Sequence, residues 1–112
     1  MLKGDILAVS KQAYLIENSY SKGSYLVIPE KHAESIADLP DDWFRDVKEL
    51  LPHIPNLPED YNLAMNHGVL AGQSIKHFHL WVIPRVAGKP SSGKGFARLI
   101  IEADDTSSVG NE

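Results

Sequence analysis

The stretch of sequence that decides the fold runs from residue 72 to residue 83 and is Gly72-Gln73-Ser74-Ile75-Lys76-His77-Phe78-His79-Leu80-Trp81-Val82-Ile83. Its second half alternates in character from residue to residue, which predicts a strand from His77 to Ile83 with one buried face. The buried face is expected to carry Phe78, Leu80 and Val82. The opposite face carries His77, His79 and Trp81, so two imidazoles project from the same side of the strand.

Other short apolar runs predict the strands that pair with this one: Ile6 to Val9, Tyr14 to Ile16, Tyr25 to Ile28 and Tyr61 to Asn66. Acidic residues at positions 41 and 42 precede an apolar stripe of Trp43, Val47 and Leu50, which predicts the main helix. A short helix is expected around residues 34–38. The sequence therefore predicts an α+β fold, with one main helix on an antiparallel sheet of five or more strands. Phe96 to Ile101 is interpreted as a final strand or a dimer contact.

The length of 112 residues predicts one domain, which we place at residues 1–102, followed by a flexible acidic tail at 103–112. A hydrophobic content of 43% with 23% charged residues is typical of soluble globular proteins. No apolar run approaches the roughly 18 to 20 residues that cross a bilayer, and no signal-peptide pattern opens the chain. A cytoplasmic location without a membrane partner is therefore expected. The absence of cysteine excludes disulfides and thiolate catalysis.

The charge is unevenly distributed although the net charge is only −4. Residues 61–101 contain no acidic residue and five basic ones, whereas residues 1–60 carry eleven acidic residues against six basic ones. A local positive field raises the occupancy of anions, so the second region is the more favourable place for an anionic ligand. A chance bias of a solvated surface is the alternative. The net negative charge of the chain argues against a nucleic-acid polymer as partner.

The histidine pair allows three interpretations. The imidazoles could lie on an exposed sheet face without a function. They could bind a metal ion with a third ligand, for which His32, His53, His67 or distant carboxylates are available. They could also serve phosphoryl or nucleotidyl transfer, in which a neutral imidazole nitrogen attacks phosphorus. Such chemistry needs donors around the phosphate oxygens, and the amide, hydroxyl and cations of Gln73, Ser74, Lys76 and Arg85 lie close in sequence.

The same stretch resembles the signature of the histidine triad (HIT) superfamily, in which a His-x-His-x-His motif follows Gly-Gln-Ser. The resemblance extends upstream to residues 25–32, Tyr-Leu-Val-Ile-Pro-Glu-Lys-His, and to Asn66 before the glycine-containing loop. It covers roughly residues 5 to 85. Three separate elements in the right order make it more specific than a His-x-His pair alone.

The resemblance implies roles position by position. His79 matches the family's nucleophile, and His77 matches the histidine that supports the nucleophile and the leaving-group side. Ser74 and Gln73 match residues that bond the phosphate and the leaving group. The positions that line or brace the site, or that bind ribose, are matched by His32, Asn66 and Asn18.

Two positions depart from the family pattern. Asn18 stands roughly where one branch keeps an acidic residue that binds ribose hydroxyls, and an amide offers only one carbonyl acceptor. Trp81 occupies the position of the third histidine. Transferase or phosphorylase members have glutamine there, so the loss of this imidazole does not by itself abolish the chemistry. Tryptophan could bond a phosphate oxygen, narrow the pocket or block it.

The implied activity is hydrolysis of a nucleotide phosphoramidate or phosphoanhydride through a nucleotidyl-histidine intermediate. The alternatives are a nucleotidyltransferase or phosphorylase, or a nucleotide-binding protein without turnover. No cofactor is expected to be required, although a divalent cation could accompany a polyphosphate substrate. Family members commonly form homodimers, and Leu99-Ile100-Ile101 is the apolar segment that could supply such an interface.

Overall fold

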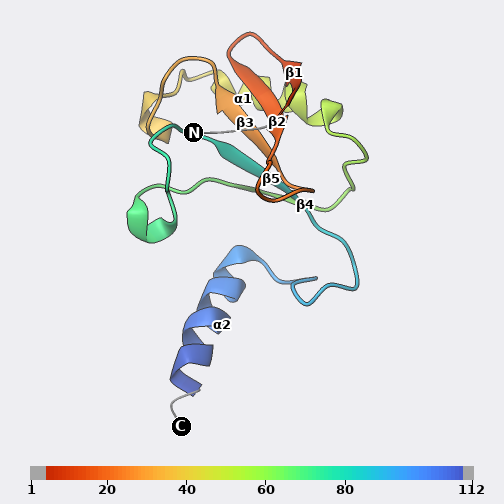
Figure 1. Cartoon of the computed structure of the whole chain (residues 1–112), viewed down its shortest axis with the longest axis vertical. Coiled ribbons are helices and arrows are strands. Elements are labelled where there is room, and N and C mark those ends of the chain that lie inside the picture. Colours follow the sequence, from red (N-terminus) through yellow and green to blue (C-terminus); the bar gives the residue numbers. More distant parts are fainter. Residues whose placement is uncertain (1–4, 110–112) are drawn as a thin grey trace.

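The computed structural model describes residues 5–109 and contains one antiparallel sheet with the strand order β1-β2-β3-β5-β4 (Figure 1). Its strands are β1 Ile6–Val9, β2 Ala13–Glu17, β3 Tyr25–Pro29, β4 Tyr61–Ala64 and β5 Leu80–Pro84. Strand β5 lies between β3 and β4, although β4 precedes it in the chain. The prediction of an α+β fold with an antiparallel sheet is confirmed.

Helix α1, Trp43–Leu50, covers one face of the sheet because its apolar stripe meets the inward residues of β2, β3 and β5. This core includes Leu15, Val27, Phe78, Leu80, Val82, Trp43, Val47 and Leu50. The indole Nε1–H of Trp43 donates to the carbonyl oxygen of Gln12 at 3.2 Å. Three single-turn helices complete the domain, at Ile36–Asp38 (η1), Leu51–His53 (η2) and Val69–Ala71 (η3). The main and the short helix are therefore present where they were predicted.

The opposite face of the sheet carries a second apolar cluster of Ile16, Leu26 and Ile28. Tyr14 and Trp81 pack against it and are only partly buried. The predicted alternation along residues 77–83 is confirmed, because Phe78, Leu80 and Val82 are buried on the α1 side. Trp81 consequently lies on the other side.

Strand β5 begins at Leu80, so the predicted start at His77 is wrong by three residues. Its pairing with β3 ends at Val27 and Leu80. Before that point the backbone N–H of Phe78 donates to the carbonyl oxygen of Ala33 at 2.6 Å, which takes the segment out of the ladder. Strand β4 likewise ends at Ala64 and not at Asn66.

The C-terminal region forms helix α2, Phe96–Val109, so the strand alternative for Phe96 to Ile101 is wrong, and the dimer contact stays a prediction. The ion pair of Arg98 with Glu102, four residues apart at 2.9 Å, supports helical structure, as do two alanines in the segment. Helix α2 extends past the expected start of the tail at residue 103. The flexibility of that tail stays a prediction, and residues 110–112 lie outside the described part of the chain.

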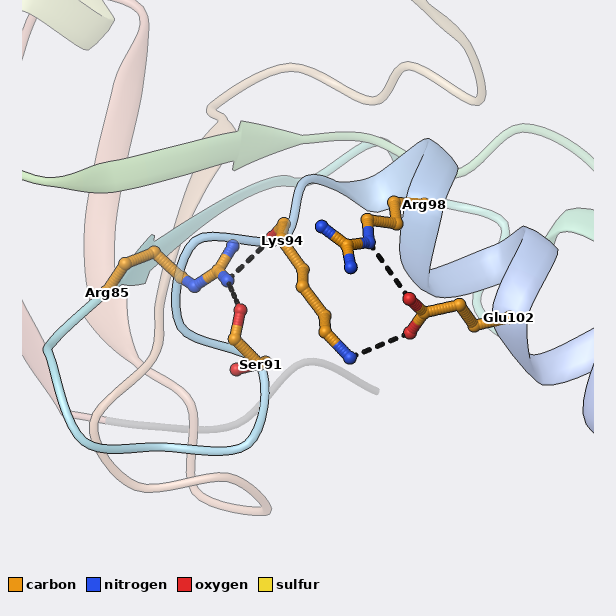
Figure 2. Close-up of polar contacts among 5 residues, drawn as sticks. All are labelled: Arg85, Ser91, Lys94, Arg98 and Glu102. Carbon is orange, nitrogen blue, oxygen red and sulfur yellow. Dashed lines mark hydrogen bonds and ion pairs between the residues drawn. The ribbon is translucent and has the colours of Figure 1, made fainter.

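Helix α2 stands away from the sheet and is joined to it by a loop (Figure 1). The Arg85 guanidinium holds this loop by donating to the carbonyl oxygens of Ser91 and Lys94 (Figure 2). It also donates to the side-chain oxygen of Asn62 on β4. Lys94 and Arg98 in turn pair with Glu102 at 2.8 and 2.9 Å. Arg85, which follows the end of β5, therefore attaches this loop to the sheet; we call this set of contacts the Arg85 clamp. No helix among residues 5–109 is long and apolar enough to span a membrane.

Candidate active site

The histidine pair lies in the segment that leads from a bend at residues 75–77 into β5, beside the chain leaving β3. The 2.6 Å bond from Phe78 N–H to Ala33 holds the two segments together, and the buried Phe78 ring anchors the first of them in the core. The ring centroids of Phe78 and Trp43 are 5.5 Å apart, edge to face. His77 and His79 flank this anchor and point to the other side of the chain. Their backbone is thus fixed by a main-chain bond and by core packing.

His79 has its tautomer set by the main chain. Its Nδ1 lies 2.9 Å from the carbonyl oxygen of His77. A carbonyl oxygen only accepts, so Nδ1 carries the hydrogen and the neutral ring has its lone pair on Nε2. The side chain is partly exposed. His79 is therefore an oriented imidazole whose outer nitrogen, when unprotonated, can act as a nucleophile.

His77 has both ring nitrogens next to protein atoms. Its Nε2 is 3.3 Å from the carbonyl oxygen of Pro29, and its Nδ1 is 3.3 Å from Nδ1 of His32. Because the carbonyl accepts from Nε2–H, the neutral ring accepts at Nδ1 the hydrogen that His32 donates. Partial burial lowers the pKa of His77, and the neighbouring His32 and His79 lower it further against the raising effect of the Pro29 carbonyl. His77 is thus held neutral and tied to the end of β3.

Trp81 follows His79 on the same side of the chain, with the ring centroids 6.1 Å apart. Its indole packs against the cluster of Ile16, Leu26 and Ile28. The Nε1–H is covered from solvent and makes no hydrogen bond to any residue within the described part of the chain. Burying an N–H donor without a hydrogen bond lowers the free energy of unfolding by about 1 to 3 kcal/mol. The indole of Trp81 therefore carries a local desolvation penalty beside the histidine pair.

The loop before the motif is closed by Gln73. Its side-chain oxygen accepts from the N–H of Gly68 at 2.9 Å, and its side-chain nitrogen donates to the carbonyl oxygen of Glu34 at 3.1 Å. Gly72 adopts a φ of 99° beside Asn66, and an added Cβ would lie 3.4 Å from the amide nitrogen of Asn66. Gln73 therefore braces this loop, and Asn66 lies next to it.

Ser74 is exposed at the end of the loop, and within residues 5–109 nothing bonds its hydroxyl. Lys76 is also exposed. These two polar groups are free to meet a ligand next to the histidine pair in sequence.

Asn18 is not brought to the histidine pair. Its side-chain oxygen accepts from the N–H of Tyr20 at 2.9 Å, and the residue is buried in the turn between β2 and β3. The register places that turn beyond the pair of Tyr25 with Val82, whereas His79 precedes Leu80. Asn18 therefore stabilises a turn at the other end of the strands.

A cavity of about 340 Å³ opens beside His32, with Lys11, Gln12, Lys31 and Trp43 in its lining. Neither this cavity nor a second one, near α2, is lined by His79 or Ser74. Within residues 5–109, no group of three or more histidine and acidic side chains is arranged to hold a metal ion.

Sequence reasoning did not find the carbonyl groups of Pro29 and Ala33, which position His77 and Phe78. A main-chain acceptor has no residue-type signal. The only indication in the sequence was the resemblance to the HIT superfamily. Its signature includes both the Val-Ile-Pro run and the histidine pair, which indicates that the two segments lie side by side.

The chain matches the HIT domain family over residues 10–88. This is more than half of its length, and the chain belongs to the HIT-domain family.

Three curated proteins illustrate the relationship. Over 120 residues the chain is 31% identical to the adenosine 5'-monophosphoramidase hnt1 of Schizosaccharomyces pombe, covering 100% of this chain and 90% of that protein. It is 38% identical over 81 residues to an uncharacterised HIT-like protein of Methanocaldococcus jannaschii, covering 68% and 63%. It is 32% identical over 74 residues to an adenylylsulfatase of Arabidopsis thaliana, covering 61% and 38%. It thus spans less than two thirds of the latter two proteins.

Solved structures show the same fold. A hypothetical histidine triad nucleotide-binding protein from Sulfolobus tokodaii superposes with a TM-score of 0.65 at 28% identity, over 85% of this chain and 70% of that one. A HIT family protein from Bacillus anthracis gives a TM-score of 0.62 at 23% identity, over 96% and 89%.

Proposed function

We propose that this protein is a nucleotide hydrolase that opens a phosphoramidate or phosphoanhydride bond through a nucleotidyl-histidine intermediate on His79. The observation that carries the proposal is the 2.9 Å contact between His79 Nδ1 and the His77 carbonyl oxygen, because it leaves the lone pair of Nε2 available. Relatives named as a monophosphoramidase and an adenylylsulfatase support the same reaction class.

The proposed reaction has two steps. In the first, Nε2 of His79 forms a bond to the phosphorus of the nucleotide, and the leaving group departs with the electron pair of the broken bond. In the second, a water oxygen attacks the phosphorus, the P–N bond breaks, and the nucleoside monophosphate is released with a proton. The hydroxyl of Ser74 is exposed next to the motif, and its proposed role is to donate to a phosphate oxygen.

We assign positioning roles to four other site residues that the sequence predicted. His77 and His32 hold the motif against Pro29 through their 3.3 Å contacts. Gln73 and Asn66 fix the loop that presents Ser74. The assignment of Gln73 to a direct phosphate bond is not supported, because both ends of its side chain already bond the backbone.

Trp81 is proposed to stand at the third position of the family motif and to form a wall beside His79. Asn18 receives no substrate contact in this proposal, since its side chain is used in the turn. No metal ligand set is proposed. Chelation of divalent ions is expected to leave the hydrolysis of adenylyl sulfate unchanged.

A homodimer is part of the proposal. Helix α2 stands away from the domain with Ile100 and Ile101 about three-fifths exposed, at 62% and 59%, and Phe96 exposed at 36%. A helix of this length is marginal without tertiary contacts, so a second copy is the proposed partner for its apolar side chains. Sedimentation of the parent and of Ile100→Glu tests this. A monomeric parent contradicts the proposed dimer.

The function is tested by incubating the parent, His79→Ala and His53→Ala with adenosine 5'-phosphoramidate, adenylyl sulfate and diadenosine polyphosphates. His53 is an exposed histidine in η2 and serves as a matched control. Nucleoside monophosphate should form with the parent and His53→Ala but not with His79→Ala. Nucleotide binding without turnover by the parent contradicts hydrolysis and favours a binding protein. Products in which an added phosphate replaces water indicate a phosphorylase.

A further inference from the structure

The groups around His79 differ in whether they can transfer a proton to a leaving group. Trp81 lies next to it on the same side of the chain, at 6.1 Å between ring centroids. An indole N–H can donate a hydrogen bond but does not ionise near neutral pH. The Nε1–H is also covered and unbonded to the described residues, so it is not part of a proton relay. Trp81 therefore occupies space beside His79 but does not act as a general acid.

His77 does not fill this role. Its Nε2–H is directed to Pro29 and its Nδ1 to His32, so the ring has no proton aimed at a substrate. Partial burial and the two neighbouring histidines also lower the pKa of His77 and keep it neutral. The Nδ1 atom of His32 is bonded to His77 through the same 3.3 Å contact.

The other hydrogen-bearing groups near the motif are poor general acids near neutral pH. Ser74 is a neutral hydroxyl, and Lys76 is an exposed ammonium. Tyr14 packs on the same apolar cluster as Trp81 and brings a phenol. Hydroxyls, phenols and ammonium groups ionise far from neutral pH and transfer protons inefficiently there. Among these described residues, none is therefore an efficient proton donor to the leaving group.

Leaving groups differ in whether they need that proton. When the bond between phosphorus and a sulfate or phosphate oxygen breaks, the leaving group departs with the electron pair as a stable anion. When a P–N bond breaks, the nitrogen must first take up a proton and then departs as a neutral amine, because an amide anion is not formed in water. A site without a general acid therefore favours substrates that release a sulfate or phosphate anion over substrates that release an amine.

We infer that this site acts on mixed anhydrides of a nucleotide, with sulfate or phosphate as leaving group, in preference to phosphoramidates, and that Trp81 determines this selectivity. The inference rests on the proposed hydrolase function and narrows its substrate class. General acid catalysis typically contributes 10² to 10⁴-fold, so a preference of roughly 100-fold or more in kcat/KM is expected.

The test compares kcat/KM for adenylyl sulfate and for adenosine 5'-phosphoramidate in the parent, Trp81→His and Trp81→Gln. Both variants replace the indole by a smaller polar group, but only imidazole can transfer a proton near neutral pH. The ratio of amide to sulfate activity should rise about 100-fold in Trp81→His and stay near the parent value in Trp81→Gln.

The outcomes separate the inference from the function on which it rests. If the parent cleaves both substrates equally, or if Trp81→His and Trp81→Gln show the same ratio, the inference is overturned and the hydrolase function stands. If the parent cleaves neither substrate and His79 acquires no nucleotide, the proposed function fails and the inference fails with it.

Discussion

The Nδ1 atom of His79 lies 2.9 Å from the carbonyl oxygen of His77, two residues earlier in the same segment. The main chain of the motif thus orients the imidazole of His79, the proposed nucleophile. The His77 side chain acts on His79 only indirectly. Its contacts with Pro29 and His32 fix the position of the main-chain carbonyl that binds His79.

Replacement of the His77 side chain should weaken the reaction without abolishing it. His77→Gln keeps the carbonyl that sets the His79 tautomer but loses the paired ring contacts. Loss of an orienting partner typically costs about 10 to 100-fold, so kcat should fall by that factor with little change in KM. Steady-state kinetics on adenylyl sulfate measures both. A loss as complete as that of His79→Ala would show that the His77 ring takes part in the chemistry.

The lowered pKa of His77 predicts a pH dependence of stability. The unfolded state binds a proton at the ordinary histidine value of 6.5, whereas the native state binds it at a lower pH. Stability therefore falls as the pH is lowered from 6.5 to the native pKa. Urea unfolding at pH 7.5 and at pH 5.5 should show a smaller decrease for His77→Gln than for the parent. Equal decreases in the two proteins would contradict the assignment.

Asp46 is predicted to stabilise the fold from outside the site. It is 3% exposed and accepts from the Ser10 hydroxyl at 2.5 Å and the Gln12 N–H at 2.6 Å. Burial raises its pKa, but these bonds and the charge of Lys11 outweigh burial and hold the pKa below the ordinary value. Asp46→Asn should lower the free energy of unfolding by about 1 to 3 kcal/mol and leave kcat unchanged.

Asp42 provides the control for that measurement. It is exposed and accepts one bond, from the Gln12 side chain at 3.1 Å. Asp42→Asn should change the free energy of unfolding by less than about 0.5 kcal/mol. Equal effects of the two substitutions would argue against a special role of Asp46.

Arg85 should control the attachment of α2 to the sheet. Arg85→Ala removes the donors to the carbonyls of Ser91 and Lys94 (Figure 2) and the donor to the Asn62 side chain. Amide hydrogens of residues 91–101 should then exchange at least about tenfold faster, while β3 and β5 keep their protection. Arg98→Ala, which breaks an exposed ion pair, should have a smaller effect. Unchanged exchange in Arg85→Ala would refute the clamp.

Sequence patterns predicted the parts of the fold that depend on periodic burial. The alternation through Phe78, Leu80 and Val82 and the stripe of Trp43 and Val47 both correspond to buried faces. The start of β5 was missed because it depends on the main-chain bond from Phe78 to Ala33, which no side chain encodes.

Helix α2 was missed for a different reason. Leu99, Ile100 and Ile101 favour a strand by residue type, but the region pairs with no strand and gains the Arg98–Glu102 pair as a helix. At the site, His77 contacts His32 and its carbonyl oxygen contacts His79, while the roles that the sequence suggests for them stay predictions. The sequence could not show that Asn18 lies in a turn at the other end of the strands, because its distance from the motif depends on the strand register.

The central claim is that Nε2 of His79 becomes covalently bonded to the nucleotide. The most direct test is intact-mass and peptide-level mass spectrometry, under non-acidic conditions, of the parent, His79→Ala and His53→Ala after brief incubation with adenylyl sulfate. The account predicts an adenylyl adduct on the peptide containing His79 in the parent and in His53→Ala, and none in His79→Ala. Turnover by the parent with an adduct on another residue, or with activity retained in His79→Ala, would contradict it.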